Sequence, residues 1–383
     1  MAYGGESGDN PKSYVTWRGR FFRTASGTWT FMKMFRKPWM SMPVAIGLLW
    51  TFTAPPAAAA QDWRWTAQQV VAPEVSLRGI SVLDRNVIWV TGTRGTVYRT
   101  ENGGATWEPL RIPDAGTLDF RDVEVLSPEH VLVMSAGEGA TSAIFRTDDG
   151  GRTWSRVSPP TRPETFYDGF AFWNAREGIL GGDPVGGEMY LLTTRDGGRT
   201  WQRVAPESLP PLAEGETGAF AASGSNVAVA GDRAWAEAVA PGGSRVARSR
   251  DRGATWEIAE TPMFRGSRTR GIFGLDFLDE RTGVAVGGDY TNEGEGTDNV
   301  ILTDDGGESW RLADTFPVFQ SAVRYLDRQR LVSVGPAGGY ASEDGGRTWR
   351  RIPGDGYHTL DRAEDGTVWA AGSNGRVARL AAE

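Results

Sequence analysis

The sequence of 383 residues contains no cysteine and only two histidines, His130 and His358. The lack of cysteine excludes disulfides, thiolate metal sites and cysteine nucleophiles. Two histidines are too few for a histidine-rich transition-metal centre. The chain also lacks a Gly-x-Ser-x-Gly nucleophile elbow and a glycine-rich phosphate loop that follows a strand and opens a helix. We therefore expect neither a metal nor a cofactor.

Basic residues are fewer than acidic ones, 41 against 48, which gives a formal charge of −7. Residues 1–60 carry seven basic and two acidic side chains, so the rest of the chain carries −12. A surface this acidic argues against nucleic acid or anionic lipid as a partner. The remaining partner classes are a protein or a polar polymer, and we expect a monomer.

The first sixty residues lack the pattern of the rest of the chain. Residues 34–60 combine a basic start, an apolar stretch and a run of small residues that ends at Ala60, which together predict a secretory signal peptide. The apolar stretch is too short and too interrupted by proline for stable membrane insertion. We expect an exported protein, periplasmic or secreted. Residues 1–33 are interpreted as a non-native or disordered extension, with a genuine cytoplasmic extension as the alternative.

A short turn phrase recurs six times: an acidic or amide residue, glycine, then Ser/Thr-Trp. The polar residues that open the phrase are Asn102, Asp149, Asp196, Asp251, Asp305 and Asp344. The tryptophans that close it are Trp107, Trp154, Trp201, Trp256, Trp310 and Trp349. Glycine permits positive φ, and the carboxylate accepts the backbone N–H groups of the turn. We interpret these residues as structural.

The tryptophans recur every 39 to 55 residues, the spacing of one four-stranded propeller blade. A seventh unit after His358 has three predicted strands and no final tryptophan strand. Trp63–Gln69 resembles the missing strand, so we expect it to complete the last blade. The prediction is an all-β, seven-bladed β-propeller over residues 61–383, closed by the N-terminal strand of the mature chain. Six or eight blades are the alternatives.

Two groups of polar residues are candidate binding sites. Aligning the unit starts places one group where the innermost strands enter the central channel: Arg78, Arg121, Asp168, Glu216, Arg270, Gln320 and His358. A second group lies in enlarged loops of units three to five, which we expect to meet on one face: Asp183, Asp232, Arg233, Trp235, Asp289, Tyr290 and Asn292. The alternative for both groups is an ordinary hydrated surface. Calcium at the oxygen-rich loop after Asp289 is a further alternative, although its spacing does not match an EF-hand.

The turns resemble the Asp-box, or BNR, repeat, and residues 61–383 resemble the photosystem II stability/assembly factor-like propellers. This resemblance implies an exported, non-catalytic binding module or assembly factor. Sialidases share the Asp boxes, so a glycoside hydrolase acting at the channel mouth is the alternative. Their Arg-Ile-Pro motif occurs at Arg111–Pro113 and Arg351–Pro353, but here it follows the turn tryptophans, where outer strands are predicted to end. Tyr167 and Glu216 are the candidate nucleophile and base of that alternative.

Overall fold

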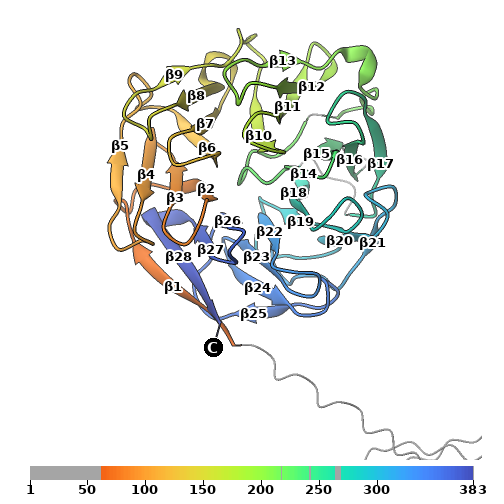
Figure 1. Ribbon diagram of the computed structural model, residues 1–383. Helices are drawn as coiled ribbons and strands as arrows, with labels where there is room; N and C mark the ends of the chain where they lie inside the picture. The colour runs from red at the N-terminus through yellow and green to blue at the C-terminus, as the bar shows by residue number, and fades with distance from the viewer. Residues whose placement is uncertain (1–61, 217, 241–242, 264–268, 383) are drawn as a thin grey trace, which may run out of the picture. The chain divides into compact units, whose positions relative to one another are not determined.

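Alternating apolar residues predict half-buried strands, and a computed structural model shows strands throughout the propeller region (Figure 1). It describes residues 62–216, 218–240, 243–263 and 269–382. The predicted extension over residues 1–33 and the predicted signal peptide lie outside the described residues. None of the helices in the described part combines the length and the apolar character that a membrane span requires.

The described strands form seven four-stranded antiparallel sheets arranged around a central axis. The innermost strands are β2 (Leu77–Val82), β6 (Asp119–Val125), β10 (Tyr167–Phe172), β14 (Val227–Ala230), β18 (Arg270–Phe277), β22 (Ala322–Tyr325) and β26 (Thr359–Arg362). The second strands are β3 (Ile88–Gly92), β7 (Val131–Ala136), β11 (Gly178–Val185), β15 (Arg233–Ala240), β19 (Gly283–Asp289), β23 (Leu331–Gly335) and β27 (Val368–Ala371). The face of the ring at which the innermost strands begin is also the face at which the second strands finish.

Two further strands complete each sheet on its outer side. The third strands are β4 (Thr96–Thr100), β8 (Ala143–Thr147), β12 (Glu188–Thr194), β16 (Gly243–Ser249), β20 (Val300–Thr303), β24 (Gly338–Ser342) and β28 (Arg376–Ala382). The outermost strands are β5 (Glu108–Leu110), β9 (Ser155–Arg156), β13 (Gln202–Arg203), β17 (Glu257–Glu260), β21 (Arg311–Leu312), β25 (Arg350–Ile352) and β1 (Trp63–Gln69). Short 3-10 turns are η1 (Gly139–Thr141), η2 (Pro206–Ser208) and η3 (Ser373–Gly375).

The ring closes through the two ends of the described chain. β1 pairs with β28 in antiparallel register, from Trp63 opposite Ala382 to Gln69 opposite Arg376. Trp65 packs on Tyr357 with ring centroids 5.4 Å apart. The predicted closure and the seven blades are therefore confirmed.

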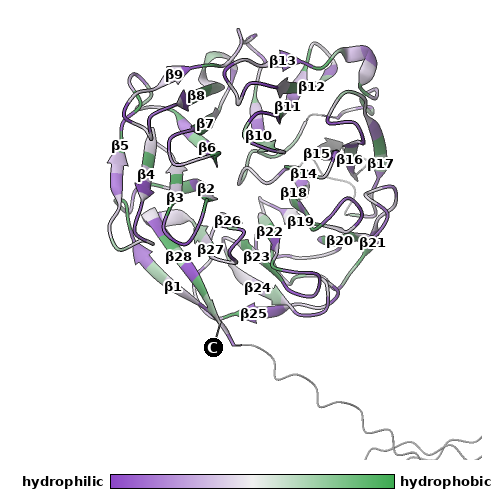
Figure 2. Cartoon of the chain, viewed as in Figure 1, coloured by the Kyte–Doolittle hydropathy of each residue, from purple (hydrophilic) through white to green (hydrophobic). Residues whose placement is uncertain are grey.

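Seven apolar clusters form the core, and each lies between two neighbouring sheets. Figure 2 shows the corresponding alternation of hydrophobic and hydrophilic residues along the strands. Trp89 of one sheet, for example, is fully buried in the same cluster as Phe120 and Val131 of the next. The turn tryptophans join these clusters: Trp154 lies edge-on to Trp89 with centroids 6.3 Å apart. Sheet-to-sheet burial, which removes large aromatic surfaces from water, therefore holds the ring together.

The recurring turns close through their own side chains. Asp305 Oδ1 accepts the Ser309 N–H at 3.0 Å and the Thr303 hydroxyl at 2.8 Å, and its Oδ2 accepts the Ser309 hydroxyl at 2.6 Å. Gly306 and Gly307, between them, adopt positive φ of 81° and 79°. The same pattern recurs at Asp149, Asp196, Asp251 and Asp344, with Asn102 as the amide version.

The innermost strand of the fourth sheet, β14, starts only at Val227, after an irregular stretch. Gly218 and Gly224 adopt φ of 116° and 70°, so the backbone leaves the extended conformation before β14. The segment 218–222 consequently forms an irregular stretch before the strand.

We predict that Asp305→Ala destabilises the protein by about 1–2 kcal/mol, because the turn N–H and hydroxyl groups lose their acceptor. Thermal unfolding measures the effect. Although burial alone would raise the pKa of Asp305, hydrogen bonds from Ser309 and Thr303 outweigh it and lower the pKa to about 2. The stabilising contribution of the Asp305 carboxylate to folding is thus fully present above the usual aspartate pKa, and it is lost as pH falls through about 2. Asp304→Ala, at the exposed neighbour, is the matched control; equal losses for the two variants would contradict the assignment.

Candidate functional site

Four of the seven described innermost strands have a β-bulge near the end where they enter the channel. The register of the pairing shifts around Arg78 in β2, Arg121 in β6, Asp168 in β10 and Phe273 in β18. A bulge leaves its extra residue unpaired and redirects the side chain. Four sheets therefore place a bulge residue at corresponding positions of the ring.

Glycine follows the bulge in three of these strands, at Gly79, Gly169 and Gly274. A Cβ atom on Gly79 would lie 3.0 Å from the Cα of Asp122 in the next sheet, and one on Gly274 would lie 2.9 Å from the Cα of Ala322. Glycine is thus needed because neighbouring innermost strands approach closely at these points.

A cavity of about 430 Å³ opens at this end of the channel. Its polar lining includes Arg78, Arg121, Asp183, Glu293 and His358. Its apolar lining includes Phe166, Phe220, Phe273, Tyr290 and Phe319. We call this cavity with its lining the channel mouth.

Arg78 is the least satisfied charged group of the mouth. Its Nε is buried and has no hydrogen-bond acceptor among the described residues. Burial, reinforced by the nearby positive charge of Arg121, lowers the pKa of Arg78 to about 10, while Asp119 and Glu293 oppose that shift. Arg78 remains protonated at neutral pH, so the mouth presents a partly desolvated cation.

Arg121 is already engaged. Its Nε and Nη2 donate to Asp119 Oδ2 at 2.8 and 2.7 Å, and its Nη1 donates to the Ala221 carbonyl at 2.6 Å. The guanidinium therefore ties β6 to the segment 218–222.

His358 faces both arginines and is 8% exposed. Its Nε2 hydrogen-bonds the Ser373 hydroxyl at 2.7 Å. Burial, together with the positive charges of Arg78 and Arg121, lowers the pKa of His358 to about 3. The imidazole is consequently neutral at physiological pH.

Aromatic side chains from separate segments make one wall of the mouth. Phe220 stacks on Phe273, with centroids 3.9 Å apart and planes 5° from parallel. Tyr290 meets Phe220 edge-on at 5.7 Å, and Phe319 meets Phe273 edge-on at 4.6 Å. Tyr290 is 48% exposed, which is unusual for a large apolar side chain of the described fold. The mouth thus joins a cation to an accessible aromatic surface, the combination found at sites that bind peptide segments.

Comparison with known proteins supports this architecture. Residues 56–164 match the family model described as photosynthesis system II assembly factor YCF48. A solved structure titled YCF48 bound to D1 peptide aligns with a TM-score of 0.59 at 18% identity, covering 82% of this chain and 96% of that one. YCF48 from Cyanidioschyzon merolae aligns with a TM-score of 0.60, also at 18% identity, covering 83% of this chain and 98% of that one.

This propeller is thus similar to YCF48 in fold, and residues 56–164 are similar to the YCF48 family in sequence. The fold is shared more widely: virginiamycin B lyase from Staphylococcus aureus aligns with a TM-score of 0.57 at 12% identity, covering 83% of this chain and 99% of that one. No curated protein matches the sequence.

The structure brings only part of the predicted channel group to the mouth. Arg78, Arg121 and His358 line it, together with Asp183 and Tyr290 from the predicted loop group. Asp168 is fully buried. Gln320 is also fully buried, and its Nε2 donates to the Phe319 carbonyl at 2.9 Å.

Two other members of the channel group are held in ion pairs. Glu216 forms a buried ion pair with Arg245. Arg270 donates to Asp289 Oδ2 at 2.8 Å and to Glu295 at 3.1 Å, and the bulge of its strand falls at Phe273 instead. Alignment by sequence missed both pairings because the partners lie on other segments.

The three enlarged loops do not meet on one face, contrary to expectation. Asp232 and Arg233 lie at the turn from β14 to β15, whereas Asp183 and Asp289 lie near the ends of β11 and β19. These positions belong to opposite ends of the ring, because antiparallel strands alternate direction. Asp232 instead binds Arg252 at 2.7 Å.

The remaining candidates of the loop group also lie at opposite ends of the ring. Trp235 is fully buried and donates to the Gly306 carbonyl at 2.9 Å. Asn292 donates to Glu295 at 2.8 Å. Although burial alone would raise the pKa of Asp289, hydrogen bonds from Arg270 and Thr291 lower it to about 2. Among the described residues no cluster of acidic or imidazole groups has the geometry to hold a metal ion.

The sialidase-like assignment finds no support in the residues proposed for it. Tyr167 is fully buried, and Glu216 is occupied by Arg245. Arg111–Pro113 follows β5, and Arg351 and Ile352 lie in β25, which are outermost strands. The Arg-Ile-Pro segments are therefore ends of outer strands, as the sequence indicated.

The sequence contains only two histidines, which allows a direct test of the mouth. In a His130→Gln variant the single remaining imidazole belongs to His358. We predict that its C2 proton resonance stays constant from about pH 8 to about pH 5, because burial and two arginines disfavour the charged ring. Adding Arg78→Gln should raise the pKa of His358. A titration centred near the usual histidine value in the first variant would contradict this electrostatic account.

Proposed function

We propose that this YCF48-like propeller is an exported, non-catalytic binding module that captures a segment of a partner protein at the channel mouth. The observation that carries the proposal is the juxtaposition of Arg78, which lacks an acceptor at its Nε, with the accessible aromatic wall at Tyr290. A related solved structure is titled YCF48 bound to D1 peptide, which supports a peptide ligand for this fold.

The lining defines the ligand chemistry. Arg78 supplies a guanidinium suited to a carboxylate, because such charge-assisted bonds are stronger than neutral ones. Phe220 and Tyr290 supply flat apolar surface for a neighbouring side chain. The ligand class is thus an extended peptide that presents an acidic group next to an apolar residue. His358 is neutral and adds a polar contact without charge.

The rigid ring explains why binding needs no large rearrangement. Arg78, Arg121 and Phe273 sit on strands rather than on free loops. A preorganised site loses less conformational entropy when its ligand binds. Capture by a preformed surface is therefore the mechanism we assign to the mouth.

We predict that Arg78→Gln combined with Tyr290→Ala weakens peptide capture at least about tenfold, which corresponds to about 1.4 kcal/mol. Peptides selected from a random display library against the parent protein serve as probes, and fluorescence anisotropy measures their Kd. Arg328→Gln, at an exposed arginine in the turn after β22, is the matched control. Parent-like affinity of the double variant for every selected peptide would refute the site.

Export is part of the same proposal and has its own test. When the full chain is expressed in a Gram-negative host, we predict that the propeller accumulates in the periplasm with Gln61 as its first residue. Intact-mass measurement of the periplasmic protein reads the cleavage directly, and replacing Ala58 and Ala60 by Arg is expected to block it. A full-length protein confined to the cytoplasm would contradict export.

A further inference from the structure

Three carboxyl groups from three different strands gather at the base of the mouth, and one of them, Asp183, also lines it. Asp168 lies in β10, Asp183 in β11 and Glu237 in β15. Asp168 is 0% exposed and Glu237 is 5% exposed. Neither carboxyl oxygen of either residue has a hydrogen-bond partner among the described residues. Buried polar atoms are almost always paired, so this cluster calls for a physical explanation.

The surroundings do not supply a matching positive charge. Arg121 on β6 attracts Asp168, but its guanidinium is bonded to Asp119. Glu216 lines the same small cavity as Glu237, and Arg245 is paired with Glu216. Two buried carboxylates and the half-buried Asp183, close together without a counterion, are strongly disfavoured.

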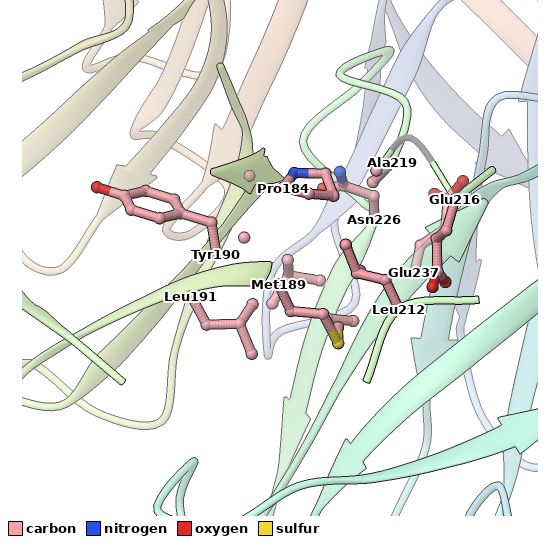
Figure 3. Close-up of a pocket in the computed structure, with 14 residues that line it drawn as sticks. Pro184, Met189, Tyr190, Leu191, Leu212, Glu216, Ala219, Asn226 and Glu237 are labelled. Atoms are coloured by element: carbon pink, nitrogen blue, oxygen red, sulfur yellow. The ribbon is translucent and has the colours of Figure 1, made fainter. Parts of the chain in front are cut away.

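Protons are the remaining way to neutralise the cluster. Burial raises the pKa of Asp183 to about 7, and burial together with the neighbouring carboxyls raises the pKa of Asp168 and of Glu237 well above the usual range. The adjoining cavity is only about 20 Å³ and is lined by Asn226, Glu237 and Tyr190 (Figure 3). Tyr190 and Glu216 are the other titratable groups of this lining. Burial raises the pKa of Tyr190, so it stays neutral, and Glu216 is paired with Arg245.

The segment 218–222 lies directly over these carboxyls. A Cβ atom on Gly218 would collide with the Asp183 carboxylate. The N–H of Ala219 faces Asp168 and Asp183, and the N–H of Phe220 faces Glu237. These N–H groups offset part of the pKa increase, yet those facing Asp168 and Glu237 do not form hydrogen bonds of ordinary geometry.

The same segment carries the aromatic wall. Phe220 stacks on Phe273 and meets Tyr290, while the Ala221 carbonyl accepts a hydrogen bond from Arg121. A displacement of the segment would therefore remove Phe220 from the wall and break its tie to β6.

We propose that Asp168, Asp183 and Glu237 form a proton-operated latch that holds the segment 218–222, and with it the aromatic wall, in place. With protons on the carboxyls the cluster is neutral and the segment packs over it. When the protons leave to solvent, like-charge repulsion and the demand for hydration drive the carboxyls apart and release the segment. The mouth then loses the Phe220 surface.

The sign of the pH dependence follows from the direction of the shifts. A carboxyl whose pKa is higher in the folded than in the unfolded state binds more protons when folded. Its stabilising contribution is complete below the unfolded pKa near 4 and is lost as pH rises through the folded value. Asp183 loses its proton first, near pH 7, so the latch opens from neutral toward alkaline pH.

Hydrogen exchange of the full propeller tests the latch without any ligand. Mass spectrometry follows the peptide 218–226 from about pH 6 to about pH 9, with rates corrected for the intrinsic pH dependence of exchange. We expect corrected protection to fall at least about tenfold in the parent. The isosteric double variant Asp168→Asn with Glu237→Gln is expected to keep its protection, because its neutral amides remove most of the repulsion.

Glu124→Gln is the matched control, since burial also raises the pKa of Glu124, to about 8, but this residue lines a different cavity with Arg324 and Asp361, which includes Ser223 and Gly224 and none of the segment 218–222. It should leave the 218–226 profile like that of the parent. If the double variant does not fold, the exchange profile of the parent protein alone tests the proposal. The peptide 338–346, in the sixth sheet, is then the internal control and is expected to lose no protection. A flat corrected profile in the parent, an unchanged loss in the folded double variant, or full protection by excess CaCl₂ at alkaline pH would overturn the proposal.

Discussion

The antiparallel pairing of β1 with β28 is the constraint on which the rest of the molecule depends. Each residue from Trp63 to Gln69 has a partner in β28, so the last sheet is completed by the first strand. An unpaired β28 would expose backbone donors and acceptors at a sheet edge. Closure also fixes the distance between the first and seventh sheets; Arg78 lies in β2 of the first, and His358 directly precedes β26 of the seventh. The channel mouth therefore exists only in a closed ring.

The close approach of the innermost strands links closure to the site. Neighbouring strands pack so tightly that Gly79 and Gly274 have no room for a side chain, and the residue before each glycine is forced out of register as a bulge. The bulges turn a cation at Arg78 and an aromatic ring at Phe273 toward one cavity. The positions of Arg78 and Phe273 in the mouth are thus a consequence of ring packing.

Local chemistry explains what was predictable from the sequence. The turn phrase encodes its own hydrogen bonds, so blade number and closure could be predicted, and aligned strand starts located Arg78, Arg121 and His358. Contacts between distant segments carry no such signal: the Phe220–Phe273 stack and the Glu216–Arg245 ion pair join residues far apart in the chain. The glycine that follows the bulge in three of the strands is the sequence signal that would have pointed to Phe273 in place of Arg270. Asp232 and Asp289 lie at opposite ends of the ring because β14 starts late in its unit, which places Asp232 in the turn that follows this innermost strand.

Strand replacement tests the central claim of ring closure most directly. A chain that begins at Val70 is compared with the parent by thermal unfolding, alone and with a synthetic peptide of residues 61–69. The account predicts that the shortened chain loses cooperative unfolding or aggregates, and that the peptide, but not a scrambled one, restores a parent-like transition. A shortened chain that remains monomeric and melts like the parent without the peptide would contradict it.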